Sequence, residues 1–219
     1  VPLPASVTEQ QAAAMMLKGL TAWFLLRRCY RVRAGESVLL HSASGGVGLI
    51  ALQWAVSLAA HVIAVVSSDE KAEVARKYGA ADVIVSDRED LVERVRTITK
   101  RRGVSVVYDG VGKDTFFASL DCLMPRGMMV SYGNASGPVP PISPLELTKR
   151  GSLYLTRPTL FHYIAKPSSL ARGASSLFEM VASGKVKLRI GQTYPLADAA
   201  QAHRDLEGRK TTGSTLLIP

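Results

Sequence analysis

The sequence predicts an α/β protein with a doubly wound, mostly parallel sheet that carries helices on both faces. Short apolar strands and helical segments alternate from residue 37 onward, as in a series of right-handed β-α-β units. The strand candidates are mostly continuous apolar runs, such as His61–Val66, which is typical of strands covered on both faces. A loop of small residues, Ser42–Gly48, joins one of these strands directly to a helix.

The elements can be assigned in order along the chain. The first is a helix from Thr8 to about Arg28, in which Thr8 is the expected N-cap and Gln11 completes a capping box. Strands are expected at 38–41, 61–66, 82–85, 104–109, 128–132 and 152–155, with helices near 47–58, 69–78, 89–100 and 113–123. After a loop rich in Gly, Ser and Pro at 134–144, we expect a helix near 168–183, a strand near 186–190, a helix at 197–206 and a last strand at 214–218. No repeat or internal linker interrupts this order, so one domain is expected.

The loop at residues 42–48 predicts a dinucleotide-binding turn. It fits the G-x-G-x-x-G pattern as Ala43-x-Gly45-x-x-Gly48, with alanine in place of the first glycine. In such a turn, small residues let the backbone approach a pyrophosphate, and the following helix presents its N-terminus to the negative charge. A valine at Gly46 is therefore expected to fill the space that the pyrophosphate needs.

The end of the second strand predicts NADP(H) rather than NAD(H). Val66 occupies the position where an acidic residue would bind the ribose 2′-hydroxyl of NAD. Ser67, Ser68 and Lys71 follow, and hydroxyl donors with a cation suit a 2′-phosphate. The alternative interpretation is that Ser68 or Asp69 caps the next helix and that Lys71 is solvated, and both interpretations can hold at once. The nearby acidic residues Asp69 and Glu70 weaken the preference for NADP(H).

Two further strand ends favour a ligand site, because ligands bind at the carboxyl ends of parallel strands. The fourth strand ends in Tyr108–Gly112 and the fifth in Ser131–Asn134, both rich in glycine. The four histidines are scattered along the chain, so no hydrolase constellation is predicted. His41 and His61 lie in strands and are expected to be structural residues.

Composition limits the remaining function classes. The net charge of +9, with basic clusters at 27–33 and 100–102, permits RNA binding but lacks interleaved aromatic residues, so RNA is a possible but disfavoured partner. No apolar run approaches the roughly 18 residues of a membrane span, and no secretory signal is present. Cys29 and Cys122 are far apart and are expected to be reduced, so we expect a cytoplasmic protein without a metal site.

Six stretches carry a more specific signal: Ala43–Gly48, Val106–Gly112, Ser119–Leu123, Gly133–Gly137, Gly151–Pro158 and Thr212–Leu217. Together they resemble the zinc-independent quinone oxidoreductases (the zeta-crystallin group) of the medium-chain dehydrogenase/reductase superfamily. Members combine an N-terminal GroES-like catalytic domain with a C-terminal Rossmann domain. The resemblance implies that residues 1–219 are the NADP-binding Rossmann domain, that residues 1–28 lead into it, and that the GroES-like domain is absent from this chain.

The resemblance also implies a set of cofactor-binding residues. Ser44, Gly45, Gly46 and Val47 would hold the pyrophosphate, and Ser68 and Lys71 would face the 2′-phosphate. The remaining positions would contact other parts of the cofactor: Thr21, which matches a cofactor-contacting threonine; Val111, Tyr132, Asn134 and residues 156–158 along the nicotinamide half; and Arg209 near the adenosine phosphate. One departure is Val85-Ser86, where close relatives have an Asn-Tyr pair, so Ser86 can donate a hydrogen bond but cannot stack.

The activity implied is the transfer of reducing equivalents from NADPH to quinones or activated enones without a metal. An enoyl-thioester reductase of the same superfamily and a non-catalytic NADPH- or RNA-binding module are the alternatives. No catalytic acid or base is predicted within this chain. Ser152–Thr156 has the pattern of a half-exposed edge strand, and the resemblance implies a homodimer joined edge to edge there.

Overall fold

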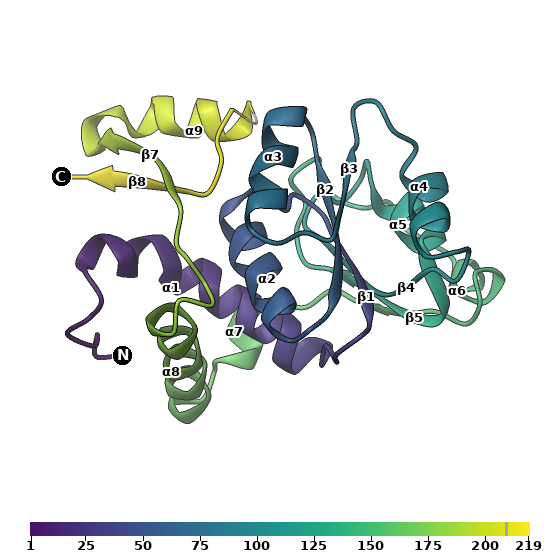
Figure 1. Cartoon of the computed structure of the whole chain (residues 1–219), viewed down its shortest axis with the longest axis horizontal. Helices are drawn as coiled ribbons and strands as arrows, with labels where there is room; N and C mark the ends of the chain where they lie inside the picture. The colour runs from purple at the N-terminus through teal and green to yellow at the C-terminus, as the bar shows by residue number, and fades with distance from the viewer. Residues whose placement is uncertain (209) are drawn as a thin grey trace.

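The computed structural model describes residues 1–208 and 210–219 and contains two sheets. The larger has six parallel strands in the order β3-β2-β1-β4-β5-β6, which is the doubly wound order of dinucleotide-binding proteins (Figure 1). Its strands are β1 (Ser37–Leu40), β2 (His61–Val66), β3 (Asp82–Val85), β4 (Val104–Asp109), β5 (Leu123–Ser131) and β6 (Tyr154–Thr156). The predicted fold class is confirmed.

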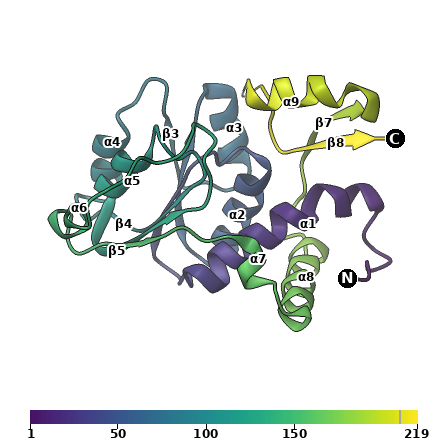
Figure 2. The ribbon, with the colours of Figure 1, turned by 180° about the vertical axis from the view of Figure 1, so that it is seen from behind.

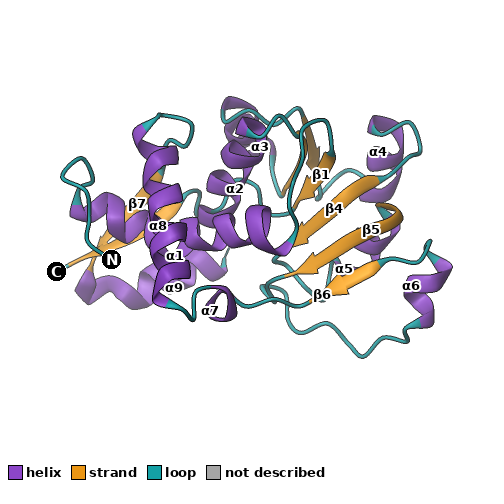
Figure 3. Cartoon of the chain, turned by 90° about the horizontal axis from the view of Figure 1, so that it is seen from below, coloured by secondary structure: helices purple, strands orange, loops and turns teal. Residues whose placement is uncertain are grey.

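The helices between these strands cover both faces of the sheet (Figure 3). They are α2 (Gly46–Ser57), α3 (Asp69–Lys77), α4 (Leu91–Ile98) and α5 (Phe116–Asp121). Two hydrophobic cores result, because alternate strand residues face opposite sides. Leu40 and Val106 face the core formed with α2 and α3, whereas Leu39 and Val107 face the core formed with α4 and α5.

The first helix, α1 (Glu9–Phe24), has the predicted capping box between Thr8 and Gln11. It ends earlier than predicted because residues Leu25–Cys29 form a π-helical turn. The amide of Tyr30 bonds the carbonyl of Leu25, which also accepts a hydrogen bond from the buried hydroxyl of Tyr108 on β4 at 3.1 Å. A contact with the central sheet therefore stabilises the end of this helix.

The last two strands differ most from expectation. The alternating segment 186–190 (Val-Lys-Leu-Arg-Ile), predicted as a strand, is largely outside β7 (Ile190–Pro195), although Val186 is buried. The backbone of Lys187 is bonded instead by the side-chain amide of Gln53, with N–O distances of 2.8 and 3.1 Å. A side chain on α2 thus makes the hydrogen bonds that a neighbouring strand would make if this segment were a strand.

Strand β7 pairs in parallel with β8 (Ser214–Ile218) in a separate two-stranded sheet. Together with η2 (Leu196–Asp198) and α9 (Ala199–Glu207), these strands lie apart from the six-stranded sheet (Figures 1 and 2). The long helix α8 (Pro167–Ala182) precedes them and packs against α1. Two short helices not predicted from the sequence, α6 (Leu145–Lys149) and α7 (Leu160–Tyr163), flank β6.

Candidate cofactor site

Two cavities lie at the carboxyl ends of the strands. The first, of about 470 Å³, lies where β1, β2 and β4 end, and its walls include Ser44, Gly45, Ser67, Lys71, Ser86 and Val111. The second, of about 480 Å³, lies between the end of α1, the end of β5 and the segment after β6. Strands β1 and β4 are neighbours from which the chain winds in opposite directions, so the first cavity is at the switch point where open α/β sheets bind ligands.

Helix α2 presents an uncapped N-terminus beside the first cavity. Gly45 is its N-cap and supplies no side-chain hydrogen bond. By contrast, α1, α3 and α4 are capped by the side chains of Thr8, Ser68 and Asp90. The first amides of α2 are thus left for another acceptor, which is the arrangement that binds phosphate groups.

The three glycines of this loop have different surroundings. A Cβ at Gly48 would lie 2.1 Å from the Ser42 carbonyl oxygen, so this glycine is needed for close packing of the helix on the strand end. A Cβ at Gly46 would meet the side-chain carbons of Lys18 at 2.7 and 2.9 Å. A side chain at Gly46 would therefore first displace the flexible stem of Lys18 on α1, and its effect on a pyrophosphate stays a prediction. Gly45 borders the cavity.

Lys18 was not singled out from the sequence. Its stem packs against the first turn of α2, and burial lowers the pKa of its ammonium group. A lone lysine in an amphipathic helix gives no sequence signal of such a position.

The end of β2 forms a cationic corner of the first cavity. Val66 is buried at the strand end, as predicted, and no carboxylate occupies its position. The Nζ atom of Lys71 donates to the hydroxyl of Ser67 at 3.0 Å, and both residues line the cavity. This pair can present a hydroxyl and an ammonium group to the same anion.

The acidic residues near this corner are engaged elsewhere. Asp69 accepts from Arg88 at 2.6 Å, and Glu89, on the cavity wall, is ion-paired with Arg94 at 2.7 Å. The hydroxyl of Ser68 caps α3 by accepting from the Lys71 amide at 3.4 Å, so the capping interpretation holds for this residue. Ser86 lines the cavity, and its hydroxyl donates to the Val66 carbonyl at 3.1 Å.

The loops after β4 and β5 pack backbone to backbone along the other side of the cavity. The Ser136 amide donates to the Val111 carbonyl at 2.8 Å, and the Ala135 amide to the Gly110 carbonyl at 3.2 Å. A Cβ at Gly133 would lie 2.4 Å from the Gly110 carbonyl oxygen, which explains why this loop needs glycine. Val111 and Ala135 line the cavity, whereas the neighbouring Asn134 is exposed and is not among the lining residues.

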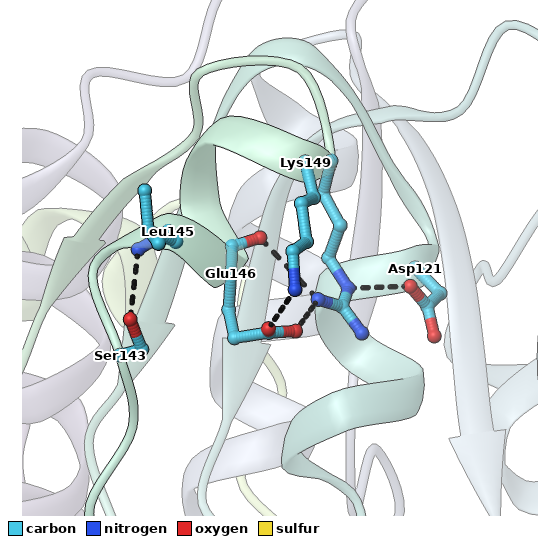
Figure 4. A network of polar contacts seen from close by, with 6 residues as sticks. Asp121, Ser143, Leu145, Glu146 and Lys149 are labelled. Atoms are coloured by element: carbon cyan, nitrogen blue, oxygen red, sulfur yellow. Dashed lines mark hydrogen bonds and ion pairs between the residues drawn. The ribbon is translucent and has the colours of Figure 1, made fainter.

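A salt-bridge network holds the end of the second of these loops. Arg150 is 2.6 Å from Asp121 on α5 and also pairs with Glu146, which accepts from Lys149 at 2.9 Å (Figure 4). The guanidinium lies 6.0 Å from the ring centroid of Phe117. The hydrogen bonds from Arg150 and Lys149 lower the pKa of Glu146. The ion pair of Arg150 with Asp121 connects the end of α6 to α5.

A buried polar cluster lies below the first cavity. The carboxylate of Asp109 is fully buried and accepts from the hydroxyl of Ser119 at 2.8 Å. The same hydroxyl lies 2.9 Å from Nε2 of His41, which borders the cavity. Sequence reasoning assigned His41 a structural role and did not single out Asp109 or Ser119.

The second cavity is walled by Thr21, Phe24, Tyr132, Arg157 and Leu160, among others. Thr21 bonds the Leu17 carbonyl at 2.8 Å within α1. Burial, with the nearby charge of Asp109, raises the pKa of Tyr132 far above neutrality, so its hydroxyl stays protonated. The cavity is therefore lined by a tyrosine, by a threonine hydroxyl that can accept a hydrogen bond, and by an arginine beside apolar side chains.

The structure thus divides the predicted residues into groups. Six line the first cavity (Ser44, Gly45, Ser67, Lys71, Ser86 and Val111) and two line the second (Thr21 and Tyr132). Gly46, Val47, Ser68 and Asn134 border neither of these cavities through the atoms described, although Gly46 and Val47 open α2 with their backbone. Arg209 lies outside the described residues.

Two further features bear on function. Within residues 1–208 and 210–219, no three His, Cys, Asp or Glu side chains gather as a metal centre requires, so the donor set does not fit a zinc ion. No helix in that same part of the chain has the length and apolar character needed to cross a membrane.

Comparison with known proteins identifies a consistent set of relatives. The profile of the zinc-binding dehydrogenase family matches residues 46–169. A quinone oxidoreductase of Pseudomonas aeruginosa is 49% identical over 219 residues, which are 100% of this chain and 67% of that protein. A 2-haloacrylate reductase of a Burkholderia species is 46% identical and is matched over 100% of this chain and 66% of its own length.

Comparison with solved structures identifies the same group of relatives. The Escherichia coli quinone oxidoreductase in complex with NADPH superposes with a TM-score of 0.98 at 50% identity, covering 100% of this chain and 68% of that one. The chain therefore spans about two thirds of the length of the relatives it matches, with the same arrangement of elements.

Proposed function

The chain belongs to the quinone oxidoreductases of the medium-chain dehydrogenase/reductase superfamily, and from this premise we propose how it binds NADPH and uses it. The adenosine half of the cofactor occupies the first cavity, and the nicotinamide half reaches the second. The observation that carries this proposal is the first cavity itself, which combines an uncapped helix N-terminus with the Lys71–Ser67 corner.

The cofactor fits these surfaces group by group. The pyrophosphate accepts hydrogen bonds from the amides that open α2, beside Gly45. The 2′-phosphate lies against Ser67 and Lys71, where Asp69 and Glu89 are neutralised by Arg88 and Arg94. The solved NADPH complex of the Escherichia coli relative supports this choice of cofactor.

The second cavity is the proposed place of hydride transfer. NADPH supplies a hydride from its nicotinamide ring. Thr21 and Tyr132 orient the ring, and Arg157 faces the electron-poor acceptor. We propose quinones or activated enones as acceptors, in line with the names of the relatives at 46–50% identity. Enoyl reductases are more distant relatives, such as the CurK enoyl reductase at 25% identity, so an enoyl-thioester substrate is the weaker alternative.

Replacing Lys71 tests the 2′-phosphate contact. We expect Lys71→Ala to weaken NADPH binding by about 1.5–3 kcal/mol, because a charge-assisted hydrogen bond is lost, and to leave NADH binding nearly unchanged. Titration calorimetry with both cofactors measures the difference. Lys77→Ala, on the exposed last turn of the same helix, is the matched control. Equal affinity of the unmodified chain for NADPH and NADH would contradict the proposal.

We also propose a homodimer joined through β6. This strand is the end member of the sheet, and Tyr154 and Leu155 expose 59% and 38% of their surface beside its unpaired edge. Two-fold pairing would satisfy both edges in the same way. The strand was predicted at 152–155, but it begins at Tyr154. Leu153 is buried, and its amide donates to the Leu147 carbonyl instead of to a neighbouring strand.

Sedimentation tests the dimer. Tyr154→Glu would place like charges on both sides of the pairing edge and is expected to shift the protein to monomer. Leu17→Glu, at an equally exposed apolar position on α1, is the control and is expected to leave the dimer intact. A monomer at micromolar concentration in the unmodified chain would refute the proposal.

The proposed compartment is the cytoplasm, where the two free thiols Cys29 and Cys122 would stay reduced. The charge of +9 permits an RNA partner, which stays the disfavoured alternative. Binding of this kind would fall steeply as salt rises.

A further inference from the structure

We infer that Asp109, acting through Ser119, fixes His41 in one tautomer, and that these three side chains position the wall of the first cavity for the dinucleotide. The inference rests on the proposed function, since it assigns positioning residues to that same site.

The carboxylate of Asp109 is the centre of this cluster. Its Oδ1 accepts from the amides of Val111 and Gly112 at 2.8 and 3.1 Å, and its Oδ2 accepts from the hydroxyls of Thr115 and Ser119 at 2.7 and 2.8 Å. One buried side chain thereby fixes both the turn after β4 and the start of α5. A buried acceptor with four donors is strongly held in place.

The direction of these hydrogen bonds determines the state of His41. A serine hydroxyl has one proton, and that of Ser119 is donated to Asp109. Ser119 Oγ must then accept from His41 Nε2 at 2.9 Å, so the imidazole carries its proton on Nε2. Burial lowers the pKa of His41, an effect larger than the opposing influence of Asp109, and the ring is neutral at pH 7.

The cluster crosses the sheet at the switch point. The His41 amide donates to the Tyr108 carbonyl at 3.1 Å, so His41, the first residue past β1, lies beside Asp109, the last residue of β4. His41, Val111 and Thr115 all line the first cavity. The relative placement of three parts of its wall therefore depends on one hydrogen-bonded unit.

The chain contains a second histidine–aspartate pair for comparison. His61 Nε2 lies 2.7 Å from Asp82, and these residues begin β2 and β3, at the edge of the sheet opposite the cavities. Their side chains are 42% and 33% exposed. It borders neither cavity described above. It is the matched control for a histidine bonded to a carboxylate without a role at the site.

The tautomer is tested by long-range ¹H–¹⁵N NMR of the imidazole nitrogens, with His41→Gln to assign the signal. The unmodified chain is expected to show the Nε2–H form. In Asp109→Asn, the amide oxygen must stay toward the Val111 and Gly112 amides, so the amide nitrogen donates to Ser119. Ser119 then donates to His41, and the proton is expected to move to Nδ1. An Nδ1–H form in the unmodified chain, or no change in the variant, would overturn the inference.

The positioning role is tested by NADPH titration. Ser119→Ala is expected to weaken NADPH binding about 3- to 30-fold, the size expected when one buried polar contact is lost. Asp82→Asn is expected to leave both the His41 signal and NADPH binding unchanged. Unchanged affinity in Ser119→Ala would overturn the positioning role. Failure of the unmodified chain to bind NADPH would instead overturn the proposed function, and the tautomer experiment can still be read because it needs no cofactor.

Discussion

Assayed alone with NADPH, the 219-residue chain is expected to reduce quinones at least about 10³-fold more slowly than a full-length relative. Holding a hydride donor and acceptor in the reactive geometry contributes roughly 7–11 kcal/mol to lowering a barrier. The chain spans 67% of the length of its Pseudomonas aeruginosa relative, and we propose that the rest of such a protein completes the substrate cleft.

The described walls of the second cavity support this expectation. Thr21, Tyr132 and Arg157 line it, and none of these is a group that takes up or releases a proton readily near neutral pH. NADPH affinity should be retained, since the first cavity is built by residues of this chain. Stopped-flow measurement of NADPH oxidation with a simple quinone gives the rate. A rate equal to that of the full-length relative would contradict the proposed division of the site.

Replacing Gly45 by valine is expected to abolish detectable NADPH binding while the protein stays folded. Gly45 has φ −80° and ψ 177°, an extended conformation that valine adopts readily. A Cβ there would lie 3.2 Å from the Ser42 carbonyl oxygen, a close contact that a small backbone shift relieves. Gly45 borders the first cavity beside the α2 amides, so the bulk of a valine at this position is expected to reduce the room for a phosphate. Several phosphate contacts are lost together, which makes the effect larger than that of Lys71→Ala.

The control is Gly46→Ala, whose added methyl would meet the flexible stem of Lys18 and, at 3.2 Å, the Gly213 carbonyl oxygen. Gly46 is not among the residues that line the first cavity. It is expected to retain most of the affinity, and calorimetry with thermal unfolding distinguishes binding from stability. Full NADPH affinity in Gly45→Val would show that the loop is an ordinary turn.

Local sequence patterns were enough to predict the central sheet. Strands at 61–66, 82–85 and 104–109 were predicted at their observed bounds, because continuous apolar runs between turn residues leave little alternative. The glycine loop before α2 and the absence of a carboxylate at Val66 were likewise visible in the sequence, and both mark the first cavity.

The missed features depend on contacts between distant segments. His41 and Ser119 are 78 residues apart, so a pattern within a window of a few residues cannot pair them. The ion pair of Asp69 with Arg88 spans 19 residues, and the positive charge of Arg88 offsets the negative charge of Asp69 near the cavity. For the same reason Val186 was assigned to a strand, whereas Gln53 satisfies the neighbouring backbone from 134 residues away.

The packing of α1 has a consequence for how the chain folds. This helix buries its apolar residues against α2, α8 and β8, and the Ser214 hydroxyl bonds the Ala14 carbonyl across 200 residues. At about 5–20 residues per second, a ribosome needs roughly 10–40 s to make that interval. During synthesis α2 follows α1 closely, but the partners of Trp23 and Phe24, at Gly173 on α8 and Tyr163 on α7, are made much later. The packing around α1 is therefore completed only after α8 and β8 have been made.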